Sequence, residues 1–231
     1  MRPLISKNLI FRLLTSVFYY MIAVPLLGLC DTIVFGLRVR GRRNIRKLRG
    51  KGAVIVCNHV HNLDCTFLGL LVAPRRSIYT SLEVLFSQPV IGSLIHCLGS
   101  VPVPSTPSGM RRFLSELTGA VKAGRLVCIY PEGELIPYCP RLRSFKEGAF
   151  TIAAKAGAPI VPVVIMARDR KGMWKVLKRK PCLTIMAGEP VYPDLNLEFR
   201  PAAHDLCGRV FDRMIELQNS CEKTNAAKRS A

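Results

Sequence analysis

Short apolar runs alternate with amphipathic segments along the chain from residue 53 onward. The runs are rich in β-branched residues and are bounded by glycine, proline or charge, which is typical of buried strands. We expect strands over residues 53–57, 77–80, 101–103, 126–130, 160–165 and 182–187. Apolar residues at helical spacing predict helices over residues 64–72, 83–98, 110–122, 147–156 and 206–217. This alternation predicts an α/β domain with a mixed, largely parallel sheet flanked by helices.

The N-terminal segment follows a different pattern. Eighteen consecutive residues, 13–30, carry no charge, which is just long enough for a membrane span. Pro25 and Gly28 interrupt it as a straight helix. No small-residue cleavage pattern follows, so we expect a retained helical membrane anchor rather than a cleaved signal peptide. The pattern leaves open whether this anchor spans the bilayer or lies in one leaflet.

A basic segment follows the apolar run. Residues 38–51 hold eight Lys and Arg and no acid, against three basic residues before the run. By the positive-inside bias, this asymmetry predicts a catalytic domain on the cytoplasmic face of a membrane. A buried core helix followed by a solvated basic loop is the alternative. We expect an anchor and basic linker over residues 1–51, a catalytic domain over 52–200, and a C-terminal helix with a basic tail over 201–231.

The charge and the hydrophobic content narrow the class of protein. The 231 residues hold 34 Lys and Arg against 15 Asp and Glu, a net charge of +19, yet 49% are hydrophobic. This hydrophobic content excludes a disordered chain. A chain that is both basic and apolar indicates an anionic membrane surface as its partner first and nucleic acid second. No zinc, RNP-type or helix-turn-helix signature is present, so we expect no nucleic-acid partner, and a basic membrane- or nucleic-acid-binding protein stays as the non-enzyme alternative.

The nine cysteines are odd in number and form no Cys-x-x-Cys pair. They are typical of reduced thiols in a cytosolic domain, and indicate neither a disulfide framework nor a zinc site. Cys57 and Cys65 lie near His59 in the sequence, which leaves a cysteine hydrolase as a rival class of enzyme.

One candidate site follows the first predicted strand of the sheet. Parallel sheets place their ligand crevice at such strand ends. There, Asp64 at the start of a helix can orient His59, five residues earlier, and leave its other ring nitrogen free to accept a proton. The spacing is equally satisfied by a helix cap at Asp64 beside a loop histidine. His59 and His61 also suggest a two-nitrogen metal site, but the cluster that would complete it is missing, so we expect no metal.

A second candidate site follows the predicted strand 126–130. Glu132 and Glu134 flank Gly133, in a region that holds few other acids. The glycine permits close backbone approach to a ligand or a positive φ, and Glu132 is able to accept a hydrogen bond from a hydroxyl. An ordinary turn is the alternative, because proline and glycine are usual turn residues.

Together these segments resemble the PlsC-like glycerolipid acyltransferases of the lysophosphatidate acyltransferase type. The resemblance covers about residues 35–190, and its blocks occur in the family's order. The family's Asn-His-x4-Asp block is met in full. The matching residues are Asn58, His59 and Asp64; Tyr130, Pro131, Glu132 and Gly133; Phe145, Lys146, Glu147 and Gly148; Val161, Pro162 and Val163; and, more loosely, Glu83, Pro89 and Gly92.

The resemblance implies an acyltransferase of phospholipid biosynthesis. His59, oriented by Asp64, would deprotonate the free hydroxyl of a lysophospholipid, most simply 1-acylglycerol-3-phosphate, for attack on acyl-CoA or acyl-carrier protein. The thioester is already activated, so neither an enzyme nucleophile nor a resident cofactor is implied. Asn58, Glu132 and Gly133 would belong to the substrate site, with the Glu-Gly block at the acceptor's glycerol phosphate.

The chain departs from the family pattern at expected phosphate contacts. Leu135 stands where the pattern has arginine, and Ser81 stands where it has a lysine before the Glu-Leu block. Another lysophospholipid or hydroxyl acceptor is therefore the alternative. Cations shortly downstream are able to pair with a phosphate in their place. The candidate substitutes are Arg141, Arg143 and Lys146.

Overall fold

The computed structural model describes residues 8–170, 172–177 and 179–227, so the end of the expected basic tail lies outside the described residues. At its centre is a seven-stranded sheet with the order β1-β7-β6-β2-β5-β3-β4. Strands β2 to β6 run parallel to one another, while β7 is antiparallel to β6 and pairs in parallel with β1. The strands are β1 (Arg38–Arg40), β2 (Ala53–Cys57), β3 (Ser77–Leu82), β4 (Ser100–Val103), β5 (Leu126–Ile129), β6 (Ile160–Arg168) and β7 (Cys182–Ala187). This confirms the predicted mixed, largely parallel α/β sheet.

Strand β2 lies at the centre of the sheet. All five of its residues are buried, and its Val54 is in register with Val127 of β5 and Ile160 of β6. A strand covered on both faces needs a continuous apolar run, which is the pattern of residues 53–57. The residues that follow β2 therefore start from a rigid position at the carboxyl edge of the parallel strands.

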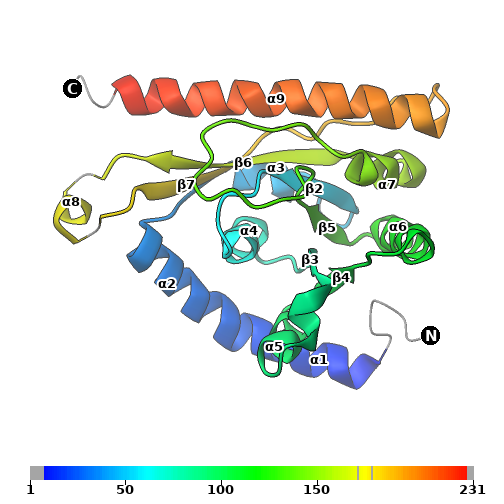
Figure 1. The fold of residues 1–231 in the computed structure, drawn as a ribbon, viewed down its shortest axis with the longest axis horizontal. Helices are drawn as coiled ribbons and strands as arrows, with labels where there is room; N and C mark the ends of the chain where they lie inside the picture. Colours follow the sequence, from blue (N-terminus) through cyan, green and yellow to red (C-terminus); the bar gives the residue numbers. More distant parts are fainter. Residues whose placement is uncertain (1–7, 171, 178, 228–231) are drawn as a thin grey trace.

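Helices cover both faces of the sheet. Helices α6, α7 and α9 pack on one face through a core that includes Phe113, Phe150 and Leu206. Helices α3 and α4 pack on the other through a core that includes Phe67 and Leu71. Figure 1 shows α9 along one side and the N-terminal helices along the opposite side, beyond α4. The bounds of these helices are α3 (Arg42–Arg46), α4 (Asp64–Val72), α6 (Pro107–Lys122), α7 (Gly148–Ala156) and α9 (Phe199–Ala227).

Residues Leu9–Phe35 form one long N-terminal helix, and among the described residues it is long and apolar enough to cross a membrane. It consists of α1 (Leu9–Phe18), a π-helical turn η1 (Tyr19–Ala23) and α2 (Val24–Phe35). Pro25 lacks a backbone N–H and crowds the carbonyl four residues earlier, and the wider turn just before it accommodates this proline. The expected interruption at Pro25 therefore widens one turn without ending the helix.

One side of the N-terminal helix is attached to the domain along its length. Near its start, Arg76 donates to Thr15 Oγ1 (3.1 Å) and Ser16 Oγ (3.3 Å). Tyr20 Oη donates to the carbonyl of Pro74 (2.8 Å). Near its end, Thr66 Oγ1 of α4 donates to Asp31 Oδ1 (3.1 Å), and α2 packs on α4. These contacts hold the helix parallel to the surface of the domain.

The other side of the N-terminal helix is exposed and apolar. Many of its large hydrophobic side chains are more than half exposed. An apolar face of this size on a soluble surface is unfavourable unless lipid or protein covers it. The exposed residues of this face are Leu9, Ile10, Leu13, Leu14, Val17, Met21, Ile22, Leu26, Leu29, Ile33 and Val34.

The structure corrects two expectations about the elements. The segment 38–51, which we expected to be a linker, contains strand β1 and helix α3, and Val39 of β1 is in register with Ile185 of β7. The single helix expected over 83–98 is wrong: a 3₁₀ turn η2 (Glu83–Ser87) and helix α5 (Ile91–Cys97) replace it. The break falls at Pro89 and Val90, because proline donates no backbone hydrogen bond and Val90 has a positive φ of 67°.

Candidate active site

Asp64 organises the loop that follows β2. It is the first residue of α4 and is completely buried. Its Oδ2 accepts hydrogen bonds from the backbone N–H groups of Val60 (2.8 Å) and His61 (3.0 Å). A carboxylate at a helix N-terminus is also stabilised by the helix dipole. The loop therefore wraps around a fixed negative charge, and the expectation that Asp64 only caps the helix is too narrow.

The same oxygen of Asp64 lies 2.8 Å from His59 Nδ1. With Asp64 ionised, Nδ1 carries the proton and donates it to the carboxylate, which leaves the Nε2 lone pair free. The ring of His59 stacks on Tyr130, with centroids 4.1 Å apart and an interplanar angle of 16°. The His59 side chain is about one quarter exposed. The predicted His59–Asp64 pair is thus formed, and a hydrogen bond and an aromatic face hold its ring.

Tyr130 is a contact whose role the sequence reasoning did not find. It stands directly after β5 and immediately before the Pro131-Glu132-Gly133 turn, so it reaches His59 across neighbouring strands β2 and β5. Burial raises the pKa of the Tyr130 hydroxyl well above its ordinary value, so the ring stays neutral. The signal available in the sequence was an aromatic residue at the end of a strand that precedes a polar turn.

Glu132 links the two loops of the site. Its Oε2 lies 3.5 Å from the backbone N of His59 and accepts from Arg143 Nη2 at 2.8 Å, and its Oε1 accepts from the backbone N–H of Arg143 at 3.3 Å. The Glu132 side chain is almost fully buried. Two further backbone bonds, Ile136 N–H to the His59 carbonyl and Tyr138 N–H to the Val60 carbonyl, join the same loops. Glu132 therefore positions the site, and its carboxylate is already occupied by protein donors.

Arg143 is also engaged within the protein. Besides Glu132, its guanidinium contacts the backbone carbonyl and the carboxylate of Glu134. A guanidinium that neutralises a buried carboxylate is costly to withdraw, because it would leave that charge unpaired. The structure therefore does not support the expectation that Arg143 is a free phosphate ligand. Its contacts with Glu132 and Glu134 instead stabilise the loop of residues 131–146, which joins β5 to α7.

Asn58 is fully engaged in the sheet as well. Its side-chain amide donates to the carbonyl of Ile165 (2.9 Å), and its Oδ1 accepts from the Ile165 N–H (2.7 Å). Asn58 is buried. It ties the end of β2 to β6, and the structure does not support the expected contact with substrate.

Two cations remain exposed on the loop after Gly133. Gly133 has a φ of 71°, and a Cβ placed on it would lie 2.6 Å from Lys146 Nζ. The ammonium of Lys146 therefore lies directly against the Glu-Gly turn, and the glycine is needed for its positive φ. Arg141 is exposed on the same loop. Of the three cations expected to substitute for the arginine at Leu135, Lys146 and Arg141 are the ones open to a ligand.

The family of the chain follows from comparison with known proteins. The family model described as Acyltransferase matches residues 36–166, which contain both loops of the site and more than half of the chain. The chain belongs to this acyltransferase family. The match includes strand β1, so the segment that we expected to be a linker is part of the domain that the family shares.

Relatives of this acyltransferase carry closely similar names. A 1-acyl-sn-glycerol-3-phosphate acyltransferase of Bacillus subtilis is 29% identical over 195 residues, covering 81% of this chain and 91% of that protein. The human protein named 1-acyl-sn-glycerol-3-phosphate acyltransferase beta is 37% identical over 143 residues, covering 56% of this chain and 47% of that protein. A chloroplastic 1-acyl-sn-glycerol-3-phosphate acyltransferase of Brassica napus is 38% identical over 118 residues, and the match spans only 33% of its length.

The fold is shared with a solved structure. The 1-acyl-sn-glycerophosphate acyltransferase PlsC from Thermotoga maritima superimposes with a TM-score of 0.60 and 20% sequence identity, over 90% of this chain and 97% of that one. At this identity the likeness establishes the architecture alone.

The remaining site residues weigh against the rival chemistries. His61 packs against the ring of Phe35 (centroids 4.8 Å apart), its Nδ1 accepts from the Leu63 N–H, and burial lowers its pKa. No group of three or more metal-ligating side chains gathers among the described residues. Burial raises the pKa of Cys57 well above its ordinary value and that of Cys65 to about 11, so neither thiol ionises appreciably near neutral pH.

We therefore expect Cys57→Ala and Cys65→Ala, made separately, to retain acyl-transfer turnover within about twofold of the wild type, since a neutral buried thiol is a poor nucleophile. The measurement is acyl transfer at pH 7 with the thermal unfolding midpoint in parallel. A loss of about 1000-fold in either variant, with the midpoint unchanged, would establish a cysteine nucleophile and contradict this expectation.

Proposed function

We propose that this acyltransferase moves a fatty acyl group from a thioester donor to the free hydroxyl of 1-acylglycerol-3-phosphate, giving phosphatidate. The observation that carries the proposal is the His59 ring, held by Asp64 at 2.8 Å and by the stacked Tyr130, with its second nitrogen free. The names of the relatives from Bacillus subtilis and human support this acceptor. Acceptors with another headgroup are the alternative, because Leu135 replaces a cation of the family pattern.

The chemistry follows from the orientation of the ring. His59 Nε2 removes the proton of the acceptor hydroxyl as its oxygen attacks the thioester carbonyl. The imidazolium that forms is stabilised by the buried carboxylate of Asp64. When the tetrahedral intermediate collapses, the new oxygen ester forms, the carbon–sulfur bond breaks, and the thiolate receives the proton from Nε2. The site then holds its starting protonation state, and the reaction uses no resident cofactor.

The acceptor phosphate is held by exposed cations of the 131–146 loop in this proposal. Lys146 Nζ lies against Gly133, which precedes Leu135 by two residues. Arg141 is exposed on the same loop and adds a planar guanidinium suited to a phosphate. Arg143 contributes indirectly, because its pairing with Glu132 keeps this loop beside His59.

The exposed apolar side of the N-terminal helix supports a reaction at a membrane. We propose that it lies in one leaflet, because its inner side is bonded to the domain through Arg76, Tyr20 and Thr66 while its outer side is apolar and exposed. A helix held along the domain in this way cannot stand across a bilayer without breaking those contacts. The basic residues that follow it support a location on the cytoplasmic face, because the anionic lipids of that leaflet attract basic segments.

Removal of the proposed base tests the function directly. We expect His59→Ala to lower kcat between about 100-fold and 10,000-fold on lysophosphatidate, because general base catalysis contributes that much. The assay offers acyl-CoA or acyl-carrier protein with lysophosphatidate, lysophosphatidylglycerol and lysophosphatidylethanolamine in parallel. His204→Ala is the matched control, since His204 is an exposed histidine of α9 whose ring pairs with the exposed carboxylate of Glu147 and not with Asp64 or Tyr130.

Unchanged turnover in His59→Ala would contradict the proposed mechanism, in which His59 is the general base. Activity that depends on His59 but is confined to another lysophospholipid would keep the mechanism and replace the acceptor.

Removal of the exposed ammonium tests the phosphate contact. We expect Lys146→Ala to raise the KM for lysophosphatidate about tenfold with a smaller change in kcat, because a charge-assisted contact to the phosphate is lost. Lys146→Arg restores the charge and is expected to recover most of the affinity, whereas the exposed Lys223→Ala leaves KM unchanged. A KM for Lys146→Ala equal to that of the wild type would show that the acceptor phosphate binds elsewhere.

A further inference from the structure

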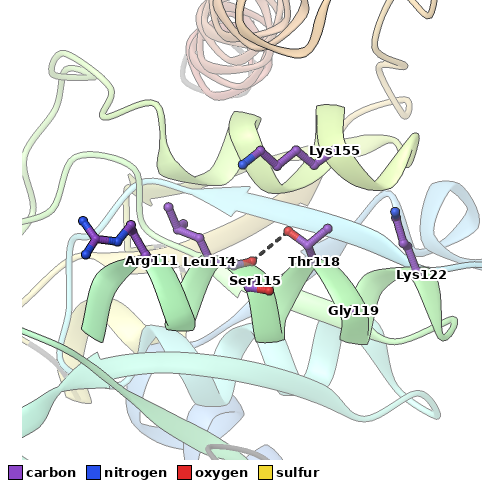
Figure 2. A pocket seen from close by; sticks show the side chains of 7 residues that line it. All are labelled: Arg111, Leu114, Ser115, Thr118, Gly119, Lys122 and Lys155. Carbon is purple, nitrogen blue, oxygen red and sulfur yellow. Dashed lines mark hydrogen bonds between the residues drawn. The ribbon is translucent and has the colours of Figure 1, made fainter. Parts of the chain in front are cut away.

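A groove of about 600 Å³ lies between α6 and α7, on the face of the sheet away from the N-terminal helix. Figure 2 shows Arg111, Leu114, Ser115, Gly119 and Lys122 on α6, with Lys155 on the facing helix α7. These α6 positions follow helical spacing, so they form a single stripe. Nothing in the proposed mechanism uses this groove.

The groove is positively charged. Arg111, Lys122 and Lys155 line it without any acidic residue, and none of the three forms an ion pair within the part of the chain that the structure describes. Lys155 Nζ lies over the ring of Phe199, 4.7 Å from its centroid, which holds the ammonium at the rim. Lys155 thus has Phe199 as an internal partner, whereas Arg111 and Lys122 have no ion-pair partner among the described residues and are exposed. The three charges are available to an external anion.

The spacing of the charges indicates an extended ligand. Arg111 and Lys122 are eleven residues apart on one helix, or about 16 Å along its axis. A single phosphate group cannot contact both. Between them lie Ser115 and Gly119, small residues that leave open space on the surface of α6. A Cβ on Gly119 would meet no atom within 4 Å. This trough fits another helix better than a nucleotide, because no aromatic side chain and no helix N-terminus lines it.

The position of the groove favours a water-soluble partner that supplies a substrate to the active site. Helices α6 and α7 both begin at the carboxyl edge of the parallel strands, where His59 and Glu132 lie. Leu114 of the groove is next to Gly148, which follows Lys146 by two residues. The lipid-facing side of the N-terminal helix is on the opposite side of the sheet (Figure 1). A partner in the groove therefore approaches from the aqueous side, with one end beside the active site.

We propose that the groove between α6 and α7 binds an acidic helix of a soluble acyl carrier protein, which delivers the acyl thioester to His59. The acidic side chains of the carrier pair with Arg111, Lys122 and Lys155, and its helix packs on the small residues of α6. This inference rests on the proposed acyl transfer, and it selects a carrier protein over free coenzyme A as the donor that the surface recognises.

The test compares two donors that deliver the same acyl group. Wild type, Arg111→Glu and Lys122→Glu are assayed with hexadecanoyl-acyl carrier protein and with hexadecanoyl-CoA, using one acceptor. We expect each reversal to lower kcat/KM for the carrier protein about tenfold and to change the value for hexadecanoyl-CoA by less than twofold. Added salt is expected to lower the wild-type value more for the carrier protein than for hexadecanoyl-CoA, because the acceptor contacts that salt also weakens are the same with both donors. Lys223→Glu, an equal charge reversal on exposed α9, is the control and leaves both values unchanged.

Three results would overturn this assignment. Equal losses of kcat/KM with both donors would show that the groove binds the acyl-pantetheine part that the donors share, and not a helix of the carrier protein. Unchanged kinetics with the carrier protein would leave the groove without this partner. A wild type that uses hexadecanoyl-CoA but not the carrier protein would contradict the docking while keeping the proposed function, whereas transfer from neither donor would contradict both.

Discussion

The site depends on one buried carboxylate. Asp64 accepts two backbone hydrogen bonds from the loop after β2 and a third from His59 Nδ1, all at the same oxygen. These bonds define the loop, the ring orientation and the protonated nitrogen together, and a helix N-terminus stabilises the negative charge. Because the interaction is buried, it is little affected by solvent, and the histidine is oriented before any substrate arrives.

The rest of the fold supplies rigid neighbours for this carboxylate. The buried β2 brings the loop to the edge of the sheet, and Asn58 ties its end to β6. The loop after the adjacent β5 contributes Tyr130, which stacks on the ring, and Glu132, which lies against the backbone of His59. Residues far apart in the chain thus meet at neighbouring strand ends, which is where parallel sheets place their sites. An apolar helix, which we propose binds the membrane, lies on one side of the sheet, and a basic groove, which we propose binds the acyl donor, lies on the other.

Much of this arrangement was predictable from local pattern. Helix α4 has the predicted bounds because an acid in its first turn is followed by an apolar run that ends before Pro74. Strand β1 was missed because Arg38-Val39-Arg40 has one apolar residue, and only pairing with β7 makes it a strand. The break at Pro89 was missed because the apolar residues on both sides of this proline suggested one continuous helix. The pairing of Arg143 with Glu132 was beyond sequence reasoning, because the distance along the chain does not tell which of several nearby charges meet.

The tautomer of His59 tests the central claim most directly. The measurement is the ¹⁵N chemical shifts of the ring in histidine-labelled protein, with His59→Gln to assign the signals. The account predicts that the neutral ring carries its proton on Nδ1, facing Asp64, and has a free lone pair on Nε2. A neutral ring protonated on Nε2 would contradict the account, because its free lone pair would then be on Nδ1, which faces Asp64 and not the acceptor hydroxyl.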